Sequence, residues 1–221
     1  GVDALKIQGG REIFDIIKAV ADAGVPVMSH VGLIPHHVHK HGGFKMQGRT
    51  AEDALQIVDN AKAIEEAGAD LGYRWYGARA LMSLRLEKSW GAWALDYRPD
   101  FNAVESGLDG FINWRKEFVG KAATEQVRAA GAARKLVTLV VDVDGIDVSN
   151  DEAILQDGAA VGYVSSGGYA HHEGRSMAMG YVDADHAAAG SKLQVEILGQ
   201  FYDAEVLGAP LYDANGANMR A

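Results

Sequence analysis

The amino-acid sequence predicts an α/β plus β fold class, in which a partial β/α-barrel-like unit is followed by an α+β segment and a small antiparallel β-barrel. Short apolar strands alternate with helical patterns over the first seventy residues, which is typical of parallel β/α units. From Lys135 onward, short apolar segments are closely spaced and separated by turn residues, as in an antiparallel barrel. The pattern changes near Asp70, where we place the main boundary.

The first segment is expected to contain two strands and two helices. Apolar residues recur at helical spacing in both helical stretches, and a glycine ends each of them. Thr50 is the predicted N-cap of the second helix, with Asp53 at its third position, a start that resembles a capping box. Leu55, Val58, Ala61, Ile64 and Ala67 are expected on one inner face of that helix. The expected elements are strands 4–8 and 25–30 and helices 11–24 and 50–68.

The second segment begins with aromatic and basic residues that predict a helix over 73–89, and a second helix is expected within 114–131. In the first of these, Ala80, Leu81 and Leu84 are expected to face a core together with Leu86. Turn signals then divide the strands, among them Asp157-Gly158 and the sequence "SSGG" at 165–168. The expected strands are "KLVTLVVDV", "AILQDG", "AAVGYVSSGG", "SMAMGYV", "KLQVEILG" and "FYDAEVL".

Composition and charge narrow the functional classes. The chain has 221 residues, 48% of them hydrophobic, and a net charge of −9, which argues against nucleic-acid binding because phosphates attract a basic surface. The sequence contains no cysteine, so disulfides and thiolate metal ligands are excluded. No apolar run approaches the roughly 20 residues of a membrane span and no signal peptide is recognisable. We therefore expect a cytoplasmic protein that binds no membrane.

The first segment resembles ketopantoate hydroxymethyltransferase (3-methyl-2-oxobutanoate hydroxymethyltransferase) in the stretches "DALKIQGG", "AGVPVMSHVGLIPHHV", "GGFKMQGRTAEDA" and "AKAIEEAGA". The resemblance implies a (β/α)₈ barrel that moves a one-carbon unit from methylenetetrahydrofolate to an α-keto acid with Mg²⁺. It makes Lys6 and His30 the catalytic candidates. Gln8 stands where the family has a glutamate that assists the metal, and Mg²⁺ favours carboxylate oxygen. The alternative is that Lys6 only reaches solvent and that His30 bonds to backbone.

Residues 71–221 resemble the C-terminal part of dimethylglycine and sarcosine dehydrogenases, which is similar to the glycine cleavage T-protein, an aminomethyltransferase. The stretches are "GARALMSLRLEKSWGAW", "VESGLDGF", "DGAAVGYVSSGGYAHHEGRSMAMGYV" and "PLYDANGANMR". The resemblance implies three domains: 1–70, the end of a folate-binding domain over 71–131, and the aminomethyltransferase barrel over 132–221. It also implies tetrahydrofolate as cofactor.

Tetrahydrofolate requires an aromatic or apolar slot and some positive charge. The cofactor-binding candidates are Arg79, Arg85, Glu87, Trp90 and Trp93. The alternative makes Arg85 and Glu87 a structural ion pair and the two tryptophans core residues.

Five histidines, His30, His36, His37, His39 and His41, lie close together in the sequence. His37 and His41 would share a face of a helix, and such pairs bind Zn²⁺ or Ni²⁺. No nearby carboxylate completes or orients a metal shell. We therefore predict no metal site.

These observations favour a tetrahydrofolate-dependent one-carbon (aminomethyl) transferase. Each half lacks part of its family's pattern, and the chain begins with Gly1, so we interpret it as a mosaic of two incomplete segments. One alternative is an Mg²⁺-dependent hydroxymethyl transferase that acts on an α-keto acid. Another is a non-catalytic module. The expected partner is a small folate or α-keto acid, and open sheet edges favour a homo-oligomer.

Overall fold

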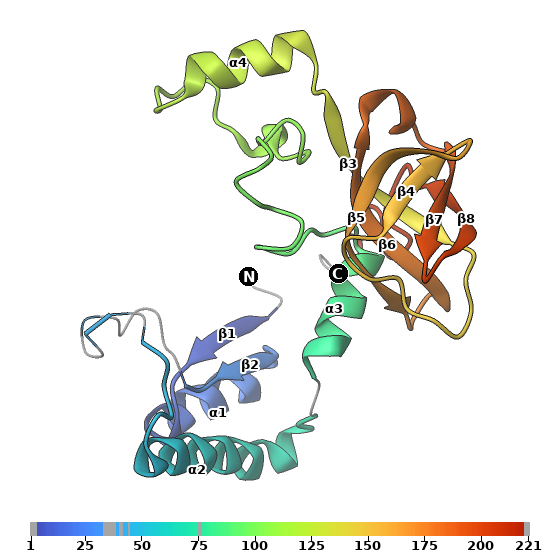
Figure 1. Ribbon diagram of the computed structural model, residues 1–221. Coiled ribbons are helices and arrows are strands. Elements are labelled where there is room, and N and C mark those ends of the chain that lie inside the picture. The colour runs from blue at the N-terminus through green and yellow to red at the C-terminus, as the bar shows by residue number, and fades with distance from the viewer. Residues whose placement is uncertain (1–3, 33–38, 40–41, 44, 75–76, 219–221) are drawn as a thin grey trace. The chain divides into compact units, whose positions relative to one another are not determined.

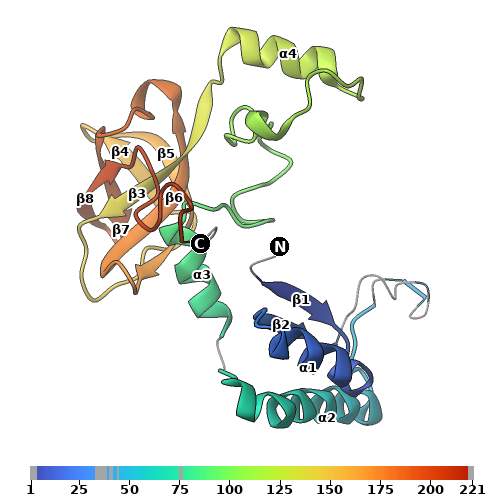
Figure 2. The same cartoon turned by 180° about the vertical axis from the view of Figure 1, so that it is seen from behind.

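The computed structural model describes residues 4–32, 39, 42–43, 45–74 and 77–218 (Figure 1). The chain divides into two compact units, and the division falls between residues 75 and 76. The same elements are seen from behind in Figure 2. Among the residues that the structure describes, no helix is both long and apolar enough to cross a membrane.

The first unit is a two-stranded parallel sheet with helices. Strand β1 (Leu5–Gln8) pairs with β2 (Val27–His30) in a register that runs from Leu5 opposite Val27 to Gln8 opposite His30. The 3-10 turn η1 (Arg11–Ile13) and helix α1 (Phe14–Asp22) connect the two strands. Helix α2 (Ala51–Gly68) follows, with the 3-10 turn η3 (Ala69–Leu71) at its end. The predicted order of strand, helix, strand and helix is confirmed.

Helix α2 begins as the sequence predicts, but only part of the predicted stripe faces inward. The amide of Asp53 donates to Thr50 Oγ1 at 3.1 Å, which satisfies one of the orphan donors of the first turn. Ala54 and Ile57 are half-buried, whereas Leu55 is 62% and Val58 45% exposed. Ala61 and Ile64 are half-buried as predicted, but the prediction was wrong for Leu55, Val58 and Ala67, which are exposed. The inward stripe begins one residue earlier than predicted, at Ala54 and Ile57, and continues at helical spacing through Ala61 and Ile64.

The second unit contains a closed antiparallel barrel, as predicted. The strand order around it is β3-β6-β5-β4-β7-β8. Alternate inward side chains such as Leu139, Ile154, Val164 and Val195 form the main core and are fully buried. Closing the sheet removes its free edges. The strands are β3 (Arg134–Val141), β4 (Ala153–Gln156), β5 (Ala159–Ala170), β6 (Arg175–Asp183), β7 (Lys192–Ile197) and β8 (Gln200–Val206).

Helix α3 (Ala78–Glu87) packs against strands β5 and β6. It is shorter than the predicted 73–89. Ser83 and Leu86 are buried, but Leu81 is 51% and Leu84 53% exposed, and Ala80 is also exposed. The prediction that Ala80, Leu81 and Leu84 face a core was therefore wrong. The barrel meets the face that carries Ser83 and Leu86, which lies on the other side of the helix.

The segment between α3 and the barrel contains the 3-10 turn η4 (Asp109–Phe111) and helix α4 (Lys121–Ala130). The guanidinium of Arg128, on α4, lies over the ring of Trp114 at 4.7 Å. It also pairs with Asp109 at 3.6 Å. A further 3-10 turn, η5 (Ala184–His186), follows strand β6.

Candidate functional site

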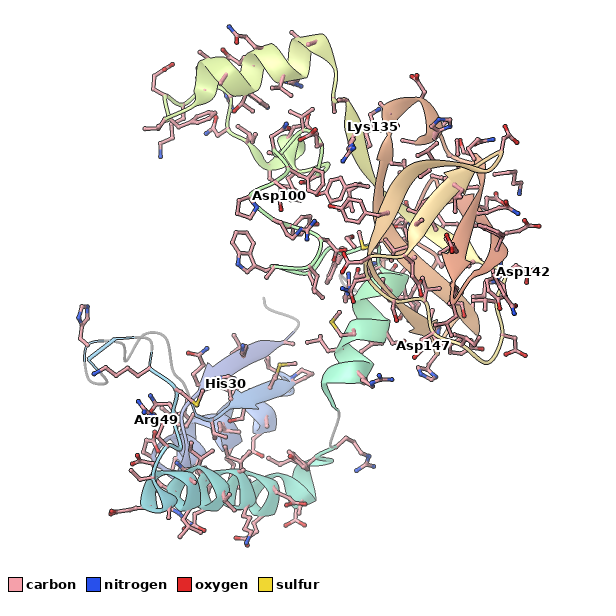
Figure 3. The ribbon with its side chains drawn as sticks, viewed as in Figure 1. His30, Arg49, Asp100, Lys135, Asp142 and Asp147 are labelled. Carbon is pink, nitrogen blue, oxygen red and sulfur yellow. The ribbon has the colours of Figure 1, made fainter. Side chains whose placement is uncertain are left out.

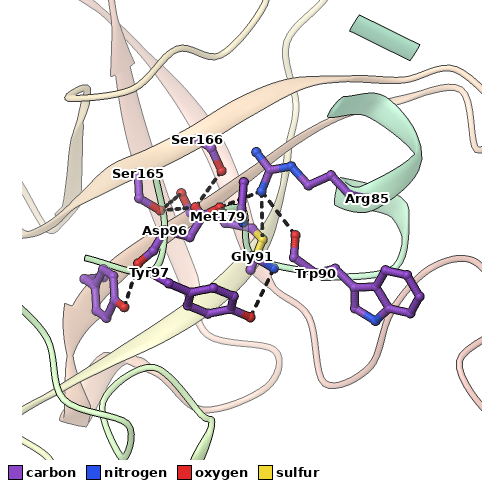
Figure 4. A network of polar contacts seen from close by, with 10 residues as sticks. Arg85, Trp90, Gly91, Asp96, Tyr97, Ser165, Ser166 and Met179 are labelled. Atoms are coloured by element: carbon purple, nitrogen blue, oxygen red, sulfur yellow. Dashed lines mark hydrogen bonds and ion pairs between the residues drawn. The ribbon is translucent and has the colours of Figure 1, made fainter. Parts of the chain in front are cut away.

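A buried polar network surrounds Asp96, in the loop after α3 (Figure 4). The Asp96 side chain is completely buried. Its Oδ2 accepts from Arg85 Nη1 at 2.6 Å and from the Ala92 amide at 2.7 Å. A buried carboxylate is tolerated only when it is paired and hydrogen-bonded, and both conditions are met here.

A tight turn delivers Asp96 to this position. The carbonyl of Ala92 accepts the amides of Asp96 at 2.9 Å and Tyr97 at 3.2 Å. Ala94 within the turn has φ 67°, a left-handed conformation that costs an L-residue about 1–2 kcal/mol. The strain is local, and the turn points the carboxylate into the protein.

Two adjacent serines of β5 complete the network. Ser165 Oγ donates to Asp96 Oδ1 at 2.5 Å and Ser166 Oγ donates to the same oxygen at 2.6 Å. Neighbouring side chains of a regular strand point to opposite faces. Here the pairing of β5 with β6 shifts register between Val164 and Ser166. This bulge lets both hydroxyls reach one carboxylate.

The sequence "SSGG" lies inside β5, so the prediction of a turn at 165–168 was wrong. Packing explains why a glycine is needed at position 167. A Cβ on Gly167 would lie 2.5 Å from the carbonyl oxygen of Val148, and a glycine is the residue that permits such a close approach of two backbones.

Arg85 lies at the edge of this network. Nη1 also donates to the Trp90 carbonyl at 3.2 Å. Within the part of the chain that the structure describes, the buried Nε and Nη2 of Arg85 have no hydrogen-bond partner. Burial lowers the pKa of Arg85, and the neighbouring Asp96 opposes that shift. The Arg85–Asp96 pair holds the loop against the helix and the barrel.

Tyr181, on β6, adds two further hydrogen bonds to the network. Its hydroxyl donates to the Asp96 carbonyl at 2.9 Å and lies 2.8 Å from Ser106 Oγ. Burial raises the pKa of the Tyr181 hydroxyl.

The end of α3 holds the C-terminal segment. Glu87 is buried; its Oε1 accepts from the His172 amide at 2.8 Å, and its carbonyl accepts from the Tyr212 amide at 3.0 Å. Lys88 Nζ donates to the carbonyl of Asp213 at 2.6 Å and pairs with its carboxylate at 3.3 Å. Burial opposes the shift, but hydrogen bonds from the Asn218 amide and from Lys88 lower the pKa of Asp213.

A cavity of about 290 Å³ opens between α3, strand β5 and the loop 147–150. Ser165 and Ser166 line it together with Leu86 and, at the rim, Arg79 and Asp147. Arg79 Nη1 lies 3.6 Å from Asp147 Oδ2, and the Arg79 side chain is 96% exposed. Asp147 is labelled beside the barrel in Figure 3. The cavity is therefore lined by residues of both charges and by serines.

The predicted cofactor-binding residues occupy different positions around this cavity. Arg79 lines it, whereas Arg85 and Glu87 are buried in the contacts described above and are not part of its lining. Trp90 is 51% and Trp93 86% exposed, and neither lines the cavity.

The two catalytic candidates lie in the first unit. Lys6, on β1, is exposed, and His30, at the end of β2, is half-buried and pairs with Gln8. Because alternate residues share a face of a strand and paired residues share a face of a sheet, Lys6, Gln8 and His30 lie on one face. His30 is labelled in Figure 3.

Within the described ranges, no group of three or more His, Asp or Glu side chains is arranged to hold a metal ion. His36, His37 and His41 lie outside the described residues, and His39 is exposed.

Asp96, Ser165 and Ser166 were not predicted as site residues from the amino-acid sequence. An aspartate in the apolar and aromatic stretch "WALDY" was the available signal for Asp96. For the serines no sequence signal existed, because a bulge depends on pairing with another strand.

Three family models match the chain. Residues 1–71 match ketopantoate hydroxymethyltransferase. Residues 43–116 match the GCVT N-terminal domain, which overlaps the first match. Residues 134–213 match the glycine cleavage T-protein C-terminal barrel domain, which is the region of the closed barrel.

Curated relatives divide in the same way. The mitochondrial dimethylglycine dehydrogenase of Homo sapiens is 36% identical over 162 residues, 72% of this chain and 18% of that protein. The 3-methyl-2-oxobutanoate hydroxymethyltransferase of Geobacter metallireducens is 48% identical over 69 residues, 31% of this chain and 26% of that protein. That of Methylibium petroleiphilum is 54% identical over 68 residues, again 31% of this chain. The chain thus spans only about a fifth to a quarter of these relatives.

The fold has a counterpart among solved structures. The glycine cleavage system aminomethyltransferase T from Bartonella henselae superposes with a TM-score of 0.65 at 23% identity, over 72% of this chain and 45% of that protein. The chain is therefore similar to ketopantoate hydroxymethyltransferase over residues 1–71 and to the glycine cleavage T-protein C-terminal barrel domain over residues 134–213.

Proposed function

We propose that the second unit binds tetrahydrofolate in the cavity between α3 and β5 and serves aminomethyl transfer, a folate-dependent one-carbon reaction. The observation that carries this proposal is the cavity itself, which opens on a barrel of the T-protein type and has a cationic residue, Arg79, at its rim. Tetrahydrofolate supplies the nitrogens that hold the one-carbon unit. The protein's part is to bind and orient it.

The lining fits one end of such a ligand. Met82, Leu86 and Leu95 provide apolar walls, and a volume of about 290 Å³ is near the lower end of ligand pockets, which begin at about 300 Å³. The cavity therefore accommodates the ring system rather than the whole molecule. The glutamate tail would lie outside it, where the exposed Arg79 attracts a carboxylate.

The other predicted cofactor-binding residues do not line the cavity in this proposal. Trp90 and Trp93 offer exposed aromatic surface. Arg85 positions the loop that carries Asp96, and Glu87 positions the C-terminal segment.

Isothermal titration calorimetry of the full chain with tetrahydrofolate tests the proposal. We expect saturable binding that Arg79→Ala weakens about fivefold, because a partly solvated charge contact contributes about 1 kcal/mol. Arg128→Ala is the matched control, since Arg128 is also in an exposed 3.6 Å pair with an aspartate but does not line the cavity. No heat of binding at millimolar ligand would overturn the proposal.

The first unit supports a second candidate, binding of an α-keto acid. It rests on 48% identity over 69 residues to a hydroxymethyltransferase and on the shared sheet face of Lys6 and His30. The residues present do not fit Mg²⁺, because Gln8 offers a neutral amide where a carboxylate is needed, so we derive no metal-dependent step.

Thermal denaturation with and without α-ketoisovalerate tests this candidate. A ligand that binds the folded unit raises its melting temperature, and Lys6→Ala should remove the increase. If neither this ligand nor tetrahydrofolate raises a melting temperature, the chain is a non-catalytic module.

A further inference from the structure

Two serines that line the cavity, Ser165 and Ser166, have hydroxyl hydrogens that are already used in hydrogen bonds. A serine hydroxyl carries one hydrogen and two lone pairs. Ser165 Oγ and Ser166 Oγ both donate to Asp96 Oδ1, at 2.5 and 2.6 Å, and Ser165 Oγ is also 3.1 Å from the Met179 carbonyl. Because all of these partners are acceptors, neither hydroxyl has a hydrogen to offer a ligand. Only oxygen lone pairs remain.

The hydrogen bonds of Asp96 keep both serine hydroxyls oriented with their hydrogens toward its carboxylate. Asp96 is held by Arg85 Nη1 and the Ala92 amide, so its carboxylate cannot turn away without leaving buried groups unpaired. Hydrogen bonds to a carboxylate also polarise the hydroxyls and make their oxygens better acceptors. The serine pair is thus a rigid double acceptor.

The charges around the cavity balance one another. Asp96 is neutralised by Arg85 at 2.6 Å, and at the rim Asp147 lies beside Arg79 at 3.6 Å. A third serine of the lining, Ser83, has no hydrogen to offer either, since its hydroxyl donates to the Tyr169 carbonyl and also accepts the His171 amide. A ligand that enters therefore needs N–H donors for the serine oxygens and no net positive charge.

We propose that Ser165 and Ser166 recognise the N–H donor edge, including the 2-amino group, of the pteridine ring of a folate bound in the cavity. This inference rests on the proposed function and adds the orientation of the ligand, with its amino edge toward the barrel. The β5 bulge makes this recognition specific, because a regular strand would present one of the two serine hydroxyls and not both.

The test compares tetrahydrofolate with 2-desaminotetrahydrofolate by isothermal titration calorimetry on the full chain. With the wild-type protein we expect the desamino ligand to bind about five- to tenfold more weakly, the effect of losing one good hydrogen bond. Ser166→Ala should remove most of this difference between the two ligands. Ser176→Ala should preserve it, since Ser176 is an equally buried barrel serine that bonds to the Val143 carbonyl and does not line the cavity.

The outcomes separate this inference from the proposed function. If tetrahydrofolate does not bind at all, the proposed function fails and the inference with it. If both ligands bind the wild-type protein equally, the orientation is wrong while the function stands. This wild-type comparison requires no variant, so it decides the question even if Ser166→Ala does not fold. If Ser166→Ala and Ser176→Ala discriminate as well as wild type does, the serines do not contact the amino edge.

Discussion

Replacing Asp96 by alanine should remove a large part of the stability of the second unit. The carboxylate accepts four hydrogen bonds, from Arg85, the Ala92 amide, Ser165 and Ser166, all at 2.5–2.7 Å. Its loss leaves the Arg85 guanidinium, whose side chain is 8% exposed, as a buried charge without its counterion. Breaking a buried pair in this way costs about 3–5 kcal/mol, against a typical domain stability of about 5–15 kcal/mol.

Differential scanning calorimetry is the suitable assay, because we expect the two compact units to unfold in separate transitions. For a chain of this size, each kcal/mol shifts the melting temperature by about 2–4 °C, so we expect the barrel transition to fall by roughly 6–20 °C. Asp100→Ala is the control. Its carboxylate is 67% exposed and lies 3.4 Å from Arg98, and an exposed pair contributes less than about 1 kcal/mol.

A double variant tests whether Asp96→Ala destabilises the protein because it leaves the Arg85 charge without a counterion. Arg85→Met combined with Asp96→Ala removes both charges and should be less destabilising than the sum of the two single changes. A loss below about 1 kcal/mol for Asp96→Ala, or strict additivity in the double variant, would refute the reasoning, because either result means that the two side chains do not depend on each other.

Three further changes probe other parts of the fold. Thr50→Ala removes the cap that the Asp53 amide uses and should cost about 1 kcal/mol; faster hydrogen exchange at that amide checks it, and Thr50→Ser should restore protection. Gly167→Ala places a Cβ 2.5 Å from the Val148 carbonyl and should cost about 1–3 kcal/mol, seen as a lower barrel melting temperature; an unchanged transition would contradict the packing. Asp213 has a lowered pKa, so its contribution to stability is present above the usual value of 3.8 and is lost as pH falls below it. The difference in melting temperature between wild type and Asp213→Asn should therefore be constant from pH 5 to 7 (about one unit or more above that pKa) and shrink in more acid solution, and a difference independent of pH would exclude this role.

Local patterns were sufficient to predict most of the elements. The Thr50 cap and the strand periods need only neighbouring residues, because capping and strand alternation operate over a few positions. The inward stripe of α2 and the outward position of Leu81 and Leu84 were not predictable in this way. They depend on what each helix packs against, and several apolar stripes of similar quality lie on one helix.

The amino-acid sequence alone determined the order of the elements, the α/β plus β class and the resemblance of each half to a different family. Only the tertiary structure decided which residues form the candidate site. The loop that carries Asp96 and the strand that carries Ser165 and Ser166 are about seventy positions apart, and their meeting requires both barrel closure and a bulge in β5. The physical reason is that a bulge and a buried ion pair are properties of contacts between distant segments, which leave no periodic signal in either segment by itself.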